Sequence, residues 1–185
     1  MKIITTTDEL VILCERLNKA EYITVDTEFL RESTYYSQLC LVQVADSKGA
    51  HAIDPLASGI DLSAFYDVMK NTNVVKVFHA CRQDLEIFYK EMGCLPEPMF
   101  DTQVAAMVCG YGDSVGYETL VNKISGEQLD KSTRYSDWSN RPLTERQIIY
   151  AIDDVTHLRG IYETLRARLI KSQRGPWLDE EMELL

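Results

Sequence analysis

Hydrophobic spacing in the first third of the chain predicts one helix followed by three strands. Residues 7–18 repeat apolar positions at helical spacing behind Thr7, a residue type that caps helices, and acidic residues follow in the first turn. Three short apolar or β-branched runs come next and are separated by turn residues, a pattern typical of a three-stranded meander. We predict these strands at residues 22–27, 39–45 and 50–53.

Helix and strand patterns then alternate through the middle of the chain. Residues 74–79 form an almost continuous apolar run, as expected for a strand that is covered on both faces. Helical spacing precedes this strand once and follows it twice, so that strand and helix alternate. We predict these helices at residues 61–71, 83–92 and 102–109.

The last third of the chain is organised around one long helix. Residues 112–143 are rich in Gly, Ser, Asp and Asn around a single short helix, and Thr144 then opens an amphipathic helix that reaches about residue 171. Gly175 and Pro176 are expected to stop this helix. We predict one compact domain over residues 1–174, followed by an acidic tail over residues 175–185 that is too short to bury a face alone.

Composition supports a globular protein and excludes several other classes. The chain has 185 residues, of which 45% are apolar and 26% charged, as in ordinary soluble domains. It shows no signal-peptide layout and no apolar run that could span a bilayer, so we expect a cytoplasmic protein without membrane contact. The five cysteines are widely spaced and never form Cys-x-x-Cys, which indicates reduced thiols rather than disulfides or a zinc site.

The distribution of charge is uneven along the chain. The formal net charge is −10, whereas nucleic-acid-binding proteins usually present a basic face. Residues 1–130 carry 10 basic and 20 acidic side chains, but residues 131–174 carry 9 basic and 5 acidic ones. Two interpretations are open at this point: a basic flank beside an acidic centre, or the solvated face of a helix.

Two carboxylates lie two residues apart on a predicted strand. Side chains at such spacing leave the same face, so Asp26 and Glu28 can reach one metal ion. Asp84 follows the buried strand 74–79 at the start of a helix, where open α/β sheets place ligand-binding groups. The alternatives are a solvated strand end for the first pair and a favourable helix dipole for Asp84.

A tyrosine and an aspartate share one face of the long helix. Tyr150 and Asp154 are four residues apart, and apolar residues surround them, which predicts a largely buried position. An unpaired aspartate is costly in such a place, and a metal ion would remove that cost. The alternative is that Asp154 pairs with an arginine or faces solvent, as its neighbour Asp153 can.

Three segments taken together resemble the exonuclease motifs of the ribonuclease D family. They are Asp-Thr-Glu-Phe (26–29), Phe-His-Ala-Cys-Arg-Gln-Asp-Leu-Glu (78–86) and Tyr-Ala-Ile-Asp-Asp-Val (150–155). Their order and separation agree with that family, and so do connecting segments such as Phe-Asp-Thr-Gln (100–103) and Asp-Trp-Ser-Asn-Arg-Pro-Leu-Thr-Glu-Arg-Gln (137–147). The similarity covers about residues 20–170 and indicates the subclass of DEDD exonucleases with a Tyr-x-x-x-Asp third motif.

The resemblance implies a fold, a reaction and a set of site residues. The implied fold is α/β and ribonuclease H-like, a mixed sheet flanked by helices. The implied reaction is 3′-5′ hydrolysis of single-stranded RNA ends to nucleoside 5′-monophosphates, in tRNA 3′ processing or RNA turnover. Two divalent ions, Mg²⁺ or Mn²⁺, would bind Asp26, Glu28, Asp84 and Asp154, and Tyr150 would position the attacking water; these five residues are the predicted catalytic set.

RNA contacts outside the carboxylates are predicted from residue type. We expect backbone contacts from Arg134, Arg141 and Arg146, and stacking on terminal bases by Phe29 and Trp138. The alternative is that Phe29 belongs to the core and that Trp138 anchors a loop.

Two other functions stay open, and the resemblance bears on the tail. They are a DNA exonuclease of the same superfamily, and a non-catalytic nucleic-acid-binding scaffold, which would be expected to have lost a ligand. Because the ribonuclease D family usually carries helical domains after the exonuclease domain, residues 175–185 are also a candidate linker to such a domain.

Overall fold

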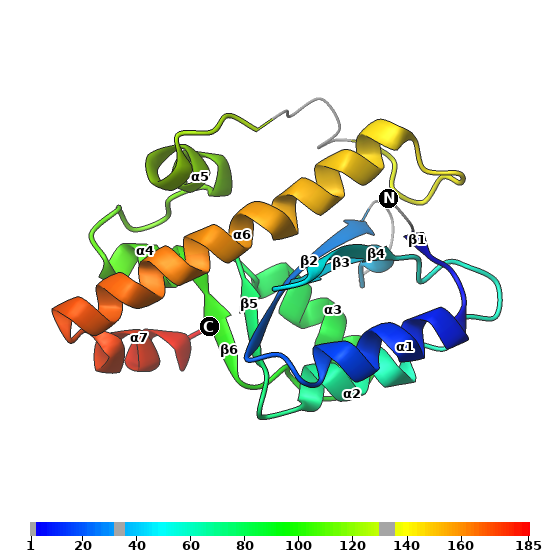
Figure 1. The fold of residues 1–185 in the computed structure, drawn as a ribbon, viewed down its shortest axis with the longest axis horizontal. Helices are drawn as coiled ribbons and strands as arrows, with labels where there is room; N and C mark the ends of the chain where they lie inside the picture. Colours follow the sequence, from blue (N-terminus) through cyan, green and yellow to red (C-terminus); the bar gives the residue numbers. More distant parts are fainter. Residues whose placement is uncertain (1–2, 32–35, 130–135) are drawn as a thin grey trace.

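The fold is built on one mixed sheet of six strands (Figure 1). The computed structural model describes residues 3–31, 36–129 and 136–185. Strands run in the order β1-β4-β3-β2-β5-β6, with antiparallel pairing of β3 to β2 and β4, and parallel pairing elsewhere. Their bounds are Ile3–Ile4, Tyr22–Leu30, Gln38–Asp46, Gly49–Ile53, Val75–Phe78 and Met99–Asp101 for β1 to β6.

Helices cover the two faces of the sheet. On one face, α1 (Thr7–Leu17), α2 (Ser63–Lys70) and α3 (Arg82–Met92) enclose the largest apolar cluster, which includes Ile23 and Val25 of β2. On the other face, α6 (Glu145–Ser172) crosses β2, β3 and β4 (Figure 1). Because side chains alternate along a strand, the neighbours of Ile23 and Val25 on β2 face α6.

The predicted α/β architecture is confirmed, with differences at short elements. Strands β1 and β6 have two and three residues, too few to show a periodic pattern, and the sequence did not predict them. The cap of α1 is Thr6, whose hydroxyl oxygen accepts from the backbone N–H of Glu9, rather than Thr7. Thr144 caps α6 as predicted, in a reciprocal arrangement with Gln147.

The segment after α6 differs from the prediction. Gln173 ends α6 in a left-handed conformation, but Gly175 and Pro176 begin a further helix, α7 (Gly175–Met182). Proline is tolerated in the first helical turn because the N–H it lacks would have no partner there. Leu178 of α7 is buried against α4 (Thr102–Val108), so this short segment packs against the rest of the domain. The predicted linker role of residues 175–185 stays a prediction.

A membrane span does not occur in the part of the chain that the structure describes. Its longest helix, α6, has 28 residues but carries charged side chains along its length. No described helix is both long and apolar enough to cross a bilayer.

Candidate active site

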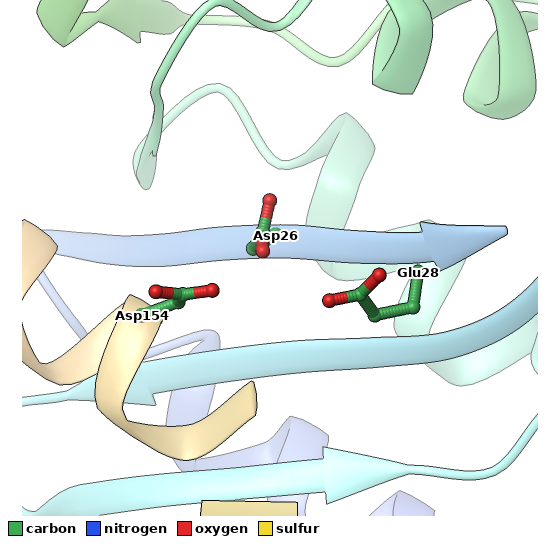
Figure 2. Close-up of side chains that lie close together, drawn as sticks. All are labelled: Asp26, Glu28 and Asp154. Atoms are coloured by element: carbon green, nitrogen blue, oxygen red, sulfur yellow. The ribbon is translucent and has the colours of Figure 1, made fainter. Parts of the chain in front are cut away.

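Three carboxylates converge between β2 and α6. Asp26 and Glu28 leave the same face of β2, and Asp154 comes from α6 (Figure 2). One oxygen atom from each carboxylate lies within 4.8 Å of the others. Asp154 is only 8% exposed. The structure therefore brings together three of the four predicted metal ligands from segments more than 120 residues apart in the sequence.

Two hydrogen bonds fix the turn of α6 that carries Asp154. The hydroxyl of Thr24, on the same face of β2 as Asp26, donates to the carbonyl oxygen of Val155 at 2.7 Å. The hydroxyl of Tyr117, in α5 (Tyr117–Ser125), donates to the carbonyl oxygen of Asp154 itself. Both bonds are made to the backbone, so they fix the position and the rotation of α6 relative to the sheet. The Asp154 carboxylate itself is oriented toward β2 (Figure 2).

The fourth predicted ligand, Asp84, lies on the opposite face of the sheet, outside this group of three carboxylates. It lies in the first turn of α3, is 8% exposed, and accepts a hydrogen bond from the hydroxyl of Thr27. The loop before α3 is shaped by the buried carboxylate of Asp101, which accepts from the backbone N–H groups of Ala80 and Cys81 at 3.1 and 2.8 Å. Ala80 has a φ of 53°, a left-handed conformation that these bonds hold in place.

The electrostatics of these carboxylates favour a bound cation. Burial raises the pKa of Asp26 from its ordinary value to about 6. Burial, and then the negative charge of Asp26, raise the pKa of Asp84 well above its usual range. Like charges brought together in a partly buried site disfavour ionisation, and a divalent ion reverses that cost. A donor set made only of carboxylate oxygens suits Mg²⁺ or Mn²⁺.

Protein stability should therefore depend on pH in a direction set by Asp26. Its pKa is raised in the folded state, so the folded protein binds more protons than the unfolded chain between the ordinary value of 3.8 and about 6. Without metal, stability should fall as pH rises through about 6, and the Asp26→Asn variant should lose less. Thermal melting measured at about pH 5 and about pH 7 tests this. An equal pH dependence in both proteins would contradict it.

Tyr150 completes the predicted catalytic set. It lies one turn before Asp154 on α6. Its side chain lines a cavity beside the carboxylates, with a volume of about 270 Å³. Asp26 and Asp154 line this cavity as well. Burial, followed by the negative charges of Asp154 and Glu28, raises the pKa of the Tyr150 hydroxyl above its ordinary value. The side chain is thus a neutral hydroxyl beside the carboxylates at any physiological pH.

Comparison with known proteins assigns this site to a family. Residues 1–170 of this chain match a protein family described as 3′-5′ exonuclease. The chain belongs to the 3′-5′ exonuclease family. Ribonuclease D of Jannaschia sp. is 60% identical over 186 residues, which cover 98% of this chain and 48% of that protein. The resemblance to ribonuclease D predicted from the motifs is thereby confirmed.

Solved structures agree with the family assignment. The crystal structure of Escherichia coli RNase D superposes with a TM-score of 0.94 at 41% identity, covering 99% of this chain and 48% of that one. Brucella melitensis NrnC with bound Mg²⁺ superposes with a TM-score of 0.78 at 25% identity, covering 90% of this chain and 82% of that one. The chain spans about half the length of the ribonuclease D relatives it matches.

The cavity is also lined by residues outside the predicted catalytic set. Tyr117 and Leu129 line it beside the carboxylates. His79 also lines it, and its Nδ1–H donates at 2.9 Å to the hydroxyl oxygen of Thr102, whose own hydrogen is donated to the Phe78 carbonyl. Burial lowers the pKa of His79, which keeps the ring neutral. These contacts hold the ring against the site.

Two of the residues predicted to contact RNA make their contacts within the domain. Trp138 is 3% exposed and packs against Tyr150, with ring centroids 6.1 Å apart, so it has no free face for a base. All five N–H donors of Arg141 are used, by the Asp54 carboxylate and by the carbonyls of Cys40, Trp138 and Asn140. Both predictions are corrected, because these side chains anchor the loop before α6.

The remaining predicted RNA contacts differ in their setting. Arg146 is exposed at the start of α6, and Phe29 is half-buried against the main apolar cluster, so both stay predictions. Arg134 lies outside the described residues.

The role of Arg141 as an anchor predicts a loss of stability on truncation. Arg141→Ala leaves the Asp54 carboxylate, 8% exposed, without its bidentate partner. Removing one partner of such a pair is expected to lower the free energy of unfolding by about 3 kcal/mol. Arg146→Ala, at an exposed position on the same segment, should change it by less than about 0.5 kcal/mol. Urea denaturation of both variants measures this, and equal effects would contradict the anchoring role.

Proposed function

We propose that this chain is a 3′-5′ exoribonuclease that removes nucleotides from RNA ends as nucleoside 5′-monophosphates. The observation that carries the proposal is the meeting of Asp26, Glu28 and Asp154 within 4.8 Å of one another, with Asp84 and Tyr150 beside them. In a scaffold without activity, three carboxylates held together in a partly buried site would repel one another without any gain. The retention of all five residues therefore favours an enzyme.

The residues fit two divalent ions, Mg²⁺ or Mn²⁺, as resident cofactors. Asp26 has carboxylate neighbours on two sides: Glu28 and Asp154 are on one side, and Asp84 is on the other. Asp26 is therefore suited to serve both ions. Glu28 and Asp154 would complete the ligands of the first ion, and Asp84 would serve the second. When bound, such a pair stabilises both the attacking and the leaving oxygen of phosphodiester hydrolysis.

Tyr150 is proposed to orient the attacking water. Its neutral hydroxyl can donate and accept one hydrogen bond without competing for a cation, since its pKa is raised further by burial. Trp138 packs against its ring and limits its motion. The cavity that Tyr150 shares with Tyr117 and Leu129 would hold the terminal nucleotide next to the carboxylates.

RNA is proposed as the substrate from the character of the relatives. The E. coli protein is described as an exoribonuclease involved in structured RNA processing. By analogy, the substrates of this chain would be single-stranded RNA 3′ ends, including those of tRNA precursors. The net charge of −10 opposes RNA binding, so the basic residues of α6, with Arg146 among them, would carry the backbone contacts.

Matched RNA and DNA strands test the substrate. Both are labelled at the 5′ end and incubated with the purified chain and Mn²⁺, and released mononucleotides are identified by chromatography. We expect progressive shortening of RNA from the 3′ end, release of nucleoside 5′-monophosphates, and slower shortening of DNA. Faster hydrolysis of DNA would overturn the RNA assignment. Binding of RNA without any shortening would favour the scaffold function.

A further inference from the structure

One buried amide has no partner in the structure. Gln43 lies in the middle of β3 and is fully buried. Neither its side-chain nitrogen nor its side-chain oxygen has a hydrogen-bond partner among the described residues. Buried polar side-chain atoms are nearly always paired in folded proteins, because an unpaired one forfeits its hydrogen bonds to water. An orphaned amide at such a position calls for a polar partner in its surroundings.

The strand register places Gln43 beside the carboxylates. Gln43 is directly opposite Asp26 on β2 and directly opposite Ala52 on β4. Directly opposed residues point to the same face with Cβ atoms about 4.5–5.5 Å apart, within reach of a glutamine side chain. Along β3 itself, the neighbours on this face are Leu41 and Ala45, which are apolar. The polar side chain directly across from Gln43 is therefore Asp26.

Other polar groups on this face are committed elsewhere. The hydroxyl of Thr24, the next residue of β2 on the same face, already donates to the carbonyl of Val155. The buried residues of α6 that cover this region include the apolar Ala151 and Ile152, which pack with Leu41 and Ala52. The named neighbours of Gln43 on this face are thus apolar, apart from Thr24 and the carboxylates.

We propose that Gln43 is a positioning residue of the metal site, whose amide N–H donates to the Asp26 carboxylate and holds it in its metal-binding orientation. An ionised carboxylate only accepts hydrogen bonds, and the Gln43 amide nitrogen offers two donors. Residues that bond to a metal-binding carboxylate in this way orient the ligand and strengthen metal binding. This inference rests on the proposed function, since it assumes that Asp26 binds a cation.

The Gln43→Met variant separates this role from a purely structural one. Methionine fills a similar volume without an amide, so metal-free melting should occur at or above the wild-type temperature. Titration calorimetry with Mn²⁺ at neutral pH should show about 10–100-fold weaker binding. Gln43→Leu provides a second apolar variant with the same expected loss of affinity. Val44→Ala, buried on the opposite face of β3, is the matched control that should lower the melting temperature and leave Mn²⁺ affinity unchanged.

The outcomes distinguish the two proposals. Wild-type Mn²⁺ affinity in Gln43→Met or Gln43→Leu would overturn the positioning role while leaving the proposed metal site intact. A lower melting temperature at unchanged affinity would likewise assign Gln43 to packing alone. Absence of Mn²⁺ binding by the wild-type chain would instead overturn the metal site of the proposed function, and the role of Gln43 with it.

Discussion

Replacing Asp154 with asparagine should lower the rate of RNA hydrolysis by at least about 10³-fold, because a metal ligand contributes several kcal/mol to the transition state. Asp154 shares its site with Asp26 and Glu28, whose oxygen atoms lie within 4.8 Å of its own. An amide is nearly the same size but carries no charge, so cation affinity should fall while α6 keeps its position through the Thr24 and Tyr117 hydrogen bonds. The initial rate of shortening of a 5′-labelled RNA measures the loss.

Asp153→Asn is the matched control for this substitution. Asp153 is the preceding residue of α6 and is exposed to solvent. The Asp153→Asn substitution removes the same charge from the same turn of α6 without changing the three carboxylates of the site. The control should keep a rate close to that of the wild type. Equal losses in the two variants would contradict the assignment of Asp154 as a metal ligand.

Tyr150→Phe should lower kcat by about 10²-fold, the scale of a positioned group that acts on the attacking water. The hydroxyl is lost, but the ring still packs against Trp138, so the fold should be unaffected, and all four carboxylates remain. Mn²⁺ affinity should therefore stay at the wild-type value. Steady-state kinetics together with titration calorimetry separate the two effects.

Tyr89→Phe is the control for loss of a tyrosine hydroxyl. Tyr89 lies on α3 and is 58% exposed, away from the cavity. Its replacement should change neither kcat nor metal affinity. If Tyr150→Phe hydrolysed RNA at the wild-type rate, Tyr150 would have no part in the reaction. If Mn²⁺ affinity fell as much as kcat, the tyrosine would act on the metal rather than on the water.

Residue spacing was enough to predict two pairs of site residues, because each pair lies within one strand or helix. Spacing by two residues on a strand and by four on a helix placed Asp26 with Glu28 and Tyr150 with Asp154 on common faces. That the two pairs belong to one site was predicted from the resemblance to a family, because spacing along the chain does not report how β2 packs against α6. Elements with strong periodicity were likewise predicted, whereas β1 and β6 were too short to leave a signal.

Contacts between distant segments were beyond the reach of the sequence. Tyr117 donates to a carbonyl 37 residues away, and nothing in its own Gly- and Ser-rich surroundings indicated that it lines the cavity. Trp138 and Arg141 were predicted to bind RNA from residue type alone. Residues that anchor loops are of the same types, so only the burial of Trp138 and the hydrogen bonds of Arg141 distinguish the two roles. The orphaned amide of Gln43 also emerged only from the register of β3 with β2.

The most direct test of the central claim is digestion of a 3′-extended, 5′-labelled RNA by the purified chain in Mg²⁺, in Mn²⁺ and in chelator, beside the Asp154→Asn variant. The proposed metal-dependent exonuclease predicts a ladder that shortens from the 3′ end with metal. The ladder should be absent in chelator and in the variant. Equal shortening in chelator, or in Asp154→Asn, would contradict the claim that these carboxylates act through bound metal ions.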